Sequence, residues 1–224
     1  MKSILIFGAT GMVGQGLLRE SLLDTRIEKI TVIGRTPLGQ IHPKLGEIVH
    51  TDLFNYKEIE GQLTDIDACF FCLGTSSTGK NEADYTRITK DLTLAAAQTL
   101  LRLNPELIFI YVSAEGVDSS ETSHLMWARI RGQTENELRR LPFKRLFIFR
   151  PAIIQPLGGI QSKTRSYRLI YSLLKPVLPV LRYFFPNFVT STKLLGRAML
   201  KVAREGYEKP IIKTADFYAI SLLK

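Results

Sequence analysis

The sequence predicts an α/β fold with a doubly wound parallel sheet. Short runs of branched and aromatic residues alternate along the chain with longer runs that have helical periodicity. The first such run is followed at once by a glycine-rich turn and an amphipathic helix. Repeated β-α units place parallel strands side by side and helices on both faces of the sheet. At 224 residues, the length suits one domain spanning residues 1–224.

Each element is predicted from its own local pattern. Apolar runs indicate strands at 3–7, 29–33, 47–50, 68–73, 107–112 and 145–149. Helical patterns cover 11–23, 82–103 and 123–141, with a short turn near 56–62. Asn81 is placed to cap the helix over 82–103, and Asp84 lies in its first turn, where an acidic group is favourable.

The turn after the first strand carries glycines at a spacing of three residues, Gly8, Gly11 and Gly14. Glycine permits a tight turn and lets phosphate oxygens approach the backbone, while the following helix directs its free N–H groups at them. The pattern predicts a dinucleotide site, and the alternative is an ordinary strand–helix turn. The turn residues expected to contact the cofactor are Gly8, Thr10, Gly11, Met12, Val13 and Gly14.

The ends of the next strands indicate which nucleotide is bound. An acidic residue after the second strand favours NAD, but this chain has Arg35, whose guanidinium suits a 2′-phosphate. We therefore expect NADP(H), with NAD(H) as second choice. Asp52 follows the third strand and is placed either to accept from the adenine amino group or to cap the next turn. Further contacts are expected from Leu53, Leu73, Gly74 and Thr75.

Two other patterns are weaker candidates for chemistry. Residues 74–80 resemble a phosphate-binding loop of the Walker type, but Asn81 replaces the hydroxyl residue that would bind Mg²⁺. Cys69 and Cys72 are spaced for redox or metal chemistry, but on a strand they would point to opposite faces. We expect core cysteines and no metal site.

Charge is distributed unevenly along the chain. Residues 1–128 carry a net charge of −5, whereas residues 129–224 carry +14 and have no acidic residue between Glu137 and Glu205. Such a balance favours an anionic partner, for which the cofactor phosphates, an anionic membrane surface, nucleic acid and an acidic protein are candidates. The alternative is a basic face without a dedicated partner. No nucleic acid is expected, the small-molecule substrate is open, and the chain is expected to be a monomer or homodimer.

Residues from about 155 to 190 are expected to form a small C-terminal cap. The segment is basic and rich in large apolar residues, and its prolines argue against one continuous helix. It is interpreted as a cover over the substrate cleft, a dimer contact or a patch on an anionic membrane. No signal peptide or membrane span is evident, so the expected location is cytoplasmic, with membrane-peripheral attachment as an extension.

Several motifs in order along the chain resemble the atypical short-chain dehydrogenase/reductase group. Within it, the chain is similar to small NAD(P)-binding proteins related to the Tat-interacting oxidoreductase and to NmrA-like and epimerase/dehydratase proteins. The matching segments are 8–14, 34–35, 52–53, 72–75, 112–116, 131–132 and 149–151. The resemblance implies a Rossmann-type sheet, NADP(H) binding and, in active relatives, hydride transfer on carbonyl, alcohol or sugar-type substrates. It also places cofactor contacts at Pro151 and Ile153.

The resemblance further implies where catalysis would reside. Active relatives use a serine and a tyrosine–lysine pair spaced by four residues, with the tyrosine as general acid/base. Ser113 occupies the serine position, but Trp127 and Arg131 stand at the tyrosine and lysine positions. An indole N–H cannot exchange protons at neutral pH, whereas Arg131 could still hold the nicotinamide ribose.

Three interpretations of this departure remain open. The chain binds NADP(H) without catalysis; it uses another acid; or the helix aligns in a different register. The other acids considered are Glu115, His124, Tyr167 and Tyr171.

Overall fold

A computed structural model of the chain describes residues 1–160 and 177–222. Its centre is a seven-stranded sheet in which all neighbouring strands are parallel. The order is β3 (Leu45–Val49), β2 (Lys29–Gly34), β1 (Ser3–Phe7), β4 (Ala68–Phe71), β5 (Ile108–Val112), β6 (Arg145–Arg150) and β9 (Ile211–Lys213). Strand order reverses between β1 and β4, so the predicted doubly wound parallel sheet is confirmed.

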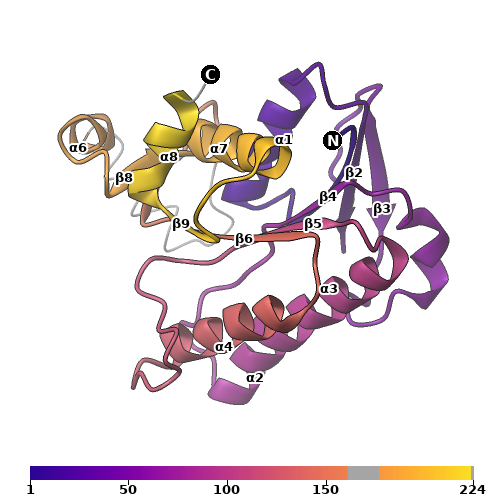
Figure 1. Ribbon diagram of the computed structural model, residues 1–224, viewed down its shortest axis with the longest axis horizontal. Coiled ribbons are helices and arrows are strands. Elements are labelled where there is room, and N and C mark those ends of the chain that lie inside the picture. The colour runs from indigo at the N-terminus through magenta and orange to yellow at the C-terminus, as the bar shows by residue number, and fades with distance from the viewer. Residues whose placement is uncertain (161–176, 223–224) are drawn as a thin grey trace.

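Helices cover both faces of the sheet (Figure 1). One face carries α1 (Met12–Leu23), α7 (Thr192–Glu205) and α8 (Thr214–Leu222), and the other carries α3 (Leu92–Leu103) and α4 (Met126–Arg140). Alternate residues of β1 supply the two apolar cores, with Ile4 and Ile6 in one and Leu5 and Phe7 in the other. The central strand is therefore buried on both sides, as expected for a parallel sheet.

The predicted helix over 82–103 is continuous but not uniform. It begins as α2 (Glu82–Thr86), passes through a π-helical turn, η2 (Arg87–Asp91), and continues as α3. The predicted cap is confirmed, because Asn81 Oδ1 accepts a hydrogen bond from the Asp84 backbone N–H at 2.8 Å.

Helix α4 starts at Met126, three residues later than predicted. The preceding loop is held by the Asp118 carboxylate, which accepts from the backbone N–H groups of Thr122 and Ser123 at 2.8 and 2.7 Å. Hydrogen bonds from the Ser120 hydroxyl and from three backbone N–H groups lower the pKa of Asp118 to about 2. These bonds keep the loop out of the helix.

The C-terminal part of the chain completes the face on which α1 lies. Helices α1 and α7 cross so closely that a Cβ at Gly16 would lie 2.8 Å from the Cβ of Thr192. Gly196 of α7 faces Gly16 in turn, with its built Cβ 3.1 Å from the Gly16 carbonyl oxygen. Two helices with glycines at the crossing bring their backbones together, which places α7 firmly against α1.

The remaining elements lie at the margins. Strands β7 (Ile153–Gln155) and β8 (Val189–Ser191) form a separate parallel pair, η1 (Lys57–Gln62) follows β3, and α6 (Leu178–Phe184) projects from the body at one side (Figure 1). The middle of the predicted 155–190 cap lies outside the described residues. Within 1–160 and 177–222, no helix is both long and apolar enough to cross a bilayer.

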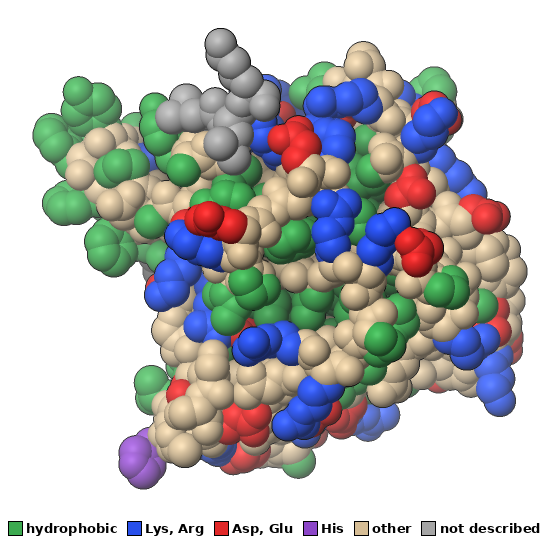
Figure 2. Space-filling model, in the orientation of Figure 1, with side chains coloured by type: hydrophobic (Ala, Val, Ile, Leu, Met, Phe, Trp, Pro, Cys, Tyr) green, Lys and Arg blue, Asp and Glu red, His purple; other side chains and the backbone are tan. Residues whose placement is uncertain are grey.

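The charge imbalance along the sequence is partly cancelled in space. Glu20 and Asp24 of α1 pair with Arg197 and Arg204 of α7, at 2.6 and 2.9 Å. Hydrogen bonds from Arg26, reinforced by Arg204, hold the pKa of Asp24 well below its usual range, despite opposition from burial. Basic and acidic side chains are accordingly interspersed on the face shown in Figure 2.

Candidate functional site

The turn between β1 and α1 is packed too tightly for side chains at two of its three glycines. Gly8 has a φ of +74°, and a Cβ there would lie 2.8 Å from the Cys72 backbone at the end of β4. A Cβ at Gly14 would lie 2.1 Å from the Gly8 carbonyl oxygen. These two glycines therefore set the path of the turn and bring the start of α1 close to the sheet.

Gly11 has a different environment. A Cβ at Gly11 would meet only the Gly8 carbonyl oxygen, at 3.3 Å, a close contact that a shift of a few tenths of an ångström would relieve, so packing restricts this position less than Gly8 or Gly14. Gly11 is also the N-cap of α1, and no side chain caps the helix, which leaves the N–H groups of its first turn available. The free donors at the start of the helix fit an incoming phosphate.

A cavity of about 380 Å³ adjoins this turn at the carboxyl ends of the first strands. Its walls combine the turn, the end of β2 and the segments after β3 and β4, and they include Gly8, Thr10, Gly34, Arg35, Leu53 and Leu73. Gln15 steadies the turn by donating from Nε2 to the Thr10 carbonyl at 2.9 Å. The structure thus brings Arg35, Leu53 and Leu73, three of the predicted cofactor contacts, to one cavity beside the turn. A second cavity of about 750 Å³ shares Thr10 and Leu38 with it and extends along α1.

Two predicted residues occupy different positions relative to this cavity. Arg35 lines it and has no carboxylate partner among the described residues. Asp52 is exposed, and its Oδ1 accepts from the Phe54 backbone N–H at 2.9 Å, which is the turn-closing role that the sequence left open. Glu47 also lines the cavity and was missed from the sequence, because a charged residue on an edge strand usually only faces solvent.

Arg131 lies beside the loop that follows β4. Its Nη2 is 3.6 Å from the built Cβ of Gly74, and its Nε donates to the Tyr85 hydroxyl at 3.1 Å. Burial opposes the charge of Arg131, but attraction to Tyr111 and Tyr85 outweighs it and raises the pKa. The guanidinium is therefore charged, fixed and directed at the predicted cofactor loop.

Burial also decides which nearby groups can exchange protons. It raises the pKa of Tyr111 to about 12, so this phenol stays protonated near neutral pH. Burial likewise raises the pKa of Cys69 and Cys72, which are free thiols as expected for core cysteines. Among the described residues, no group of three potential metal ligands is present.

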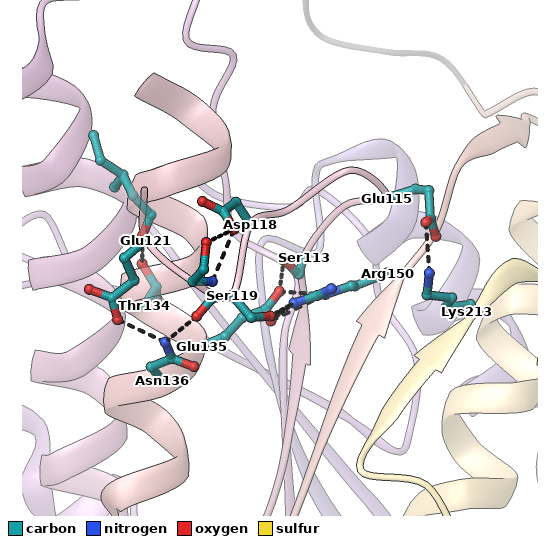
Figure 3. Close-up of polar contacts among 12 residues, drawn as sticks. Ser113, Glu115, Asp118, Ser119, Glu121, Thr134, Glu135, Asn136, Arg150 and Lys213 are labelled. Atoms are coloured by element: carbon teal, nitrogen blue, oxygen red, sulfur yellow. Dashed lines mark hydrogen bonds and ion pairs between the residues drawn. The ribbon is translucent and has the colours of Figure 1, made fainter. Parts of the chain in front are cut away.

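The Ser113 hydroxyl is engaged by a buried carboxylate (Figure 3). Its Oγ donates to Glu135 Oε1 at 2.5 Å, and Glu135 forms an ion pair with Arg150 at 2.5 Å. The Glu135 and Arg150 side chains are only 1% and 9% exposed. Arg150 also donates to the Ser119 hydroxyl at 2.6 Å, which ties α4, β6 and the loop after β5 together. In this arrangement Ser113 has no hydrogen to donate to a substrate oxygen.

The other catalytic candidates have the following surroundings. The Trp127 ring lies over Gly116, with Cη2 3.2 Å from the built Cβ. Glu115 pairs with Lys213 at 3.1 Å (Figure 3), and His124 is exposed on the loop before α4. Tyr167 and Tyr171 lie outside the described residues.

The strand order and the glycine turn at its reversal define a Rossmann-type α/β protein. Comparison with known proteins agrees. Rat HTATIP2 (Rattus norvegicus) is 28% identical over 156 residues, which are 68% of this chain and 63% of the rat protein. The FMP52-1 protein of Scheffersomyces stipitis is 25% identical over 217 residues, 94% of this chain and 93% of that protein. The chain thus matches less than two thirds of the rat relative, and no family model matches it.

Solved structures share the fold at low identity. A UDP-N-acetylglucosamine 4-epimerase from Methanobrevibacter ruminantium has a TM-score of 0.69 at 15% identity, covering 94% of this chain and 75% of the epimerase. A short-chain dehydrogenase family protein from Francisella tularensis has a TM-score of 0.67 at 12% identity, covering 98% and 99%. Together with the relatives, these matches confirm the resemblance to atypical short-chain dehydrogenase/reductase proteins.

The relatives also correct one expectation. Five matched proteins of the FMP52 kind are named as mitochondrial. The expectation of a cytoplasmic location is therefore wrong. It was based on the absence of a recognisable leader, and absence of a pattern is weak evidence about location.

We predict that Glu135→Gln lowers the free energy of unfolding by about 3–5 kcal/mol, because it leaves the buried Arg150 charge without its carboxylate. Urea denaturation measures the change. Glu137→Gln is the control, since the Glu137–Arg140 pair is exposed and its loss should cost less than about 1 kcal/mol. Equal losses in the two variants would contradict the importance of the buried pair.

Proposed function

We propose that this chain is an NADP(H)-binding, oxidoreductase-like protein of the atypical short-chain dehydrogenase type. The observation that carries the proposal is that three features follow the carboxyl ends of the neighbouring strands β1, β2 and β4. The uncapped start of α1 at Gly11 suits the pyrophosphate, Arg35 lines the cavity and suits a 2′-phosphate, and the loop at Gly74 passes beside the charged Arg131. A solved relative in fold, a dTDP-glucose 4,6-dehydratase from Streptomyces venezuelae, has NAD bound, which supports a nicotinamide nucleotide in general.

Each protein group in this proposal has a defined task. The first-turn N–H groups of α1 hold the pyrophosphate, and the Arg131 guanidinium holds the nicotinamide ribose near Gly74. Pro151 and Ile153 continue from β6 and would border the nicotinamide ring. When bound, the nicotinamide supplies hydride chemistry, and the candidate substrates are small carbonyl, alcohol or sugar-type compounds.

A second candidate function is a nucleotide-responsive binding protein without hydride transfer. It is favoured by the Ser113–Glu135 hydrogen bond, which uses the serine donor, and by Trp127, which offers no exchangeable acid. Under this alternative, NADP(H) acts as a ligand that the protein senses, and a partner molecule reads the bound state.

Gly11→Asp is expected to weaken NADPH binding by at least about a hundredfold, because the new carboxylate faces the pyrophosphate. The fold should persist, since aspartate suits the extended N-cap backbone at Gly11. Calorimetric titration measures the change, with Gly61→Asp as control because no atom lies within 4 Å of its built Cβ. Unchanged affinity in a folded Gly11→Asp variant would place the nucleotide elsewhere.

Arg35→Ala is expected to weaken NADPH by about ten- to a hundredfold and NADH by less than about twofold, since a charge-assisted hydrogen bond to the 2′-phosphate is lost. Parallel titrations with both nucleotides test this. Arg139→Ala removes an exposed arginine distant in the sequence and serves as the control. An equal loss for both nucleotides would refute recognition of the 2′-phosphate.

The non-catalytic alternative is tested by restoring the usual pair. Wild type is expected to oxidise NADPH no faster than a blank with small aldehydes and ketones, because no described acid replaces the tyrosine. The variant Trp127→Tyr/Arg131→Lys should then exceed wild type by at least about tenfold, given the usual contribution of a general acid. Turnover by wild type would reject this alternative in favour of an active oxidoreductase.

We also propose an anionic membrane surface as a partner of helix α6. The exposed residues Val180, Tyr183, Phe184 and Phe188 form an apolar projection, visible at the left of Figure 2. Leu178, only 2% exposed, anchors the helix to the body. An apolar projection inserts readily into a lipid interface. The sequence between Glu137 and Glu205 contains no acidic residue, which favours binding to acidic headgroups.

Vesicle flotation tests this partner. Wild type should float with vesicles that contain about one third phosphatidylserine at low salt. Phe184→Glu should reduce the bound fraction at least about fivefold, because a phenyl ring that would be buried in the lipid is lost. Leu23→Glu is the control, since Leu23 and Phe184 are both 67% exposed but Leu23 lies at the end of α1. Absence of wild-type flotation would exclude the membrane.

A further inference from the structure

The proposed nucleotide cavity is lined by one acidic and one basic side chain. Glu47 and Arg35 both line the 380 Å³ cavity, and neither has an ion-pair partner among the described residues. Glu47 lies on β3 opposite Val32 of β2, so it reaches the cavity from the neighbouring strand rather than from the β2 end. The site where the ribose 2′ position is expected therefore presents both signs of charge.

A specific contact fixes the Glu47 carboxylate at this wall. Its Oε1 accepts a hydrogen bond from the backbone N–H of Leu38, in the loop that carries Arg35 and Thr36 away from β2. Leu38 and Thr36 line the same cavity. The contact joins the edge strand to the loop and holds the carboxylate in place. Because the Glu47 side chain is already ordered, ligand binding costs less conformational entropy.

We propose that Glu47 is a second specificity-determining residue of the nucleotide site. Its carboxylate accepts a hydrogen bond from a ribose hydroxyl but repels a 2′-phosphate, which carries close to two negative charges near neutral pH. Glu47 thereby limits the preference for NADPH that Arg35 supplies. This inference rests on the proposed nucleotide function and adds that wild type accepts both NADPH and NADH.

The decisive variant is Glu47→Gln. The amide oxygen can still accept from the Leu38 N–H, so the loop should keep its position while the charge disappears. At low salt we expect NADPH to bind about five- to tenfold more tightly than to wild type, and NADH to change by less than about threefold. The gain for NADPH should shrink at about 0.5 M salt, since screening weakens the repulsion that the variant removes.

Glu58→Gln is the matched control. It removes the same charge from an exposed position on η1 outside the cavity, so it should leave both affinities unchanged. Calorimetric titrations of NADPH and NADH with the three proteins give the ratio of affinities directly.

Three outcomes would overturn the inference. An unchanged NADPH/NADH ratio in Glu47→Gln, or the same shift in Glu58→Gln, would show that Glu47 has no local effect on specificity. Equal weakening of both nucleotides would show that Glu47 only holds the loop. A wild-type protein that binds neither nucleotide would instead overturn the proposed function itself, and this result is distinct from normal binding with an unchanged ratio.

Discussion

The position of helix α1 depends on close contacts that only glycine permits, and the rest of the structure is arranged around it. Gly14 places its first turn against the Gly8 carbonyl, and Gly16 lets Thr192, at the start of α7, lie directly against the α1 backbone. A larger residue at either position would push the helix away from the sheet or from α7. The turn beside the cavity and the C-terminal helix α7 therefore share one structural requirement, because both are packed against α1.

At the carboxyl end of β5, a buried ion pair dominates the chemistry. Glu135 and Arg150 are removed from water, so their charges require each other and the hydrogen bonds from Ser113 and to Ser119. This network rigidifies the place where active relatives would expose a serine. The serine donates to a buried carboxylate, and Trp127 stands at the tyrosine position. The features that suit nucleotide binding are therefore better preserved than those that suit proton transfer.

The distribution of charge along the sequence differs from its distribution in the folded protein. The acidic first half and basic second half suggest a polar molecule, but α1 and α7 bring Glu20 and Asp24 to Arg197 and Arg204. Part of the excess positive charge is thereby used inside the fold, on helix faces that are 177 to 180 residues apart in the chain. Arg35 lines the cavity without a carboxylate partner among the described residues, so its positive charge remains available for an anion.

The sequence by itself determined the alternation of strands and helices, the glycine turn, the Asn81 cap and the resemblance carried by ordered motifs, because periodicity and turn chemistry are local properties. It did not reveal β7, β8 and β9, since strands of three residues are too short to show alternation. Only the tertiary structure decided that Ser113 meets Glu135, that Arg131 meets Tyr85 and that Glu47 and Arg35 line the same cavity. Those pairings join residues that are 12 to 46 positions apart, and no local pattern encodes which side chains a folded sheet and its helices will bring together.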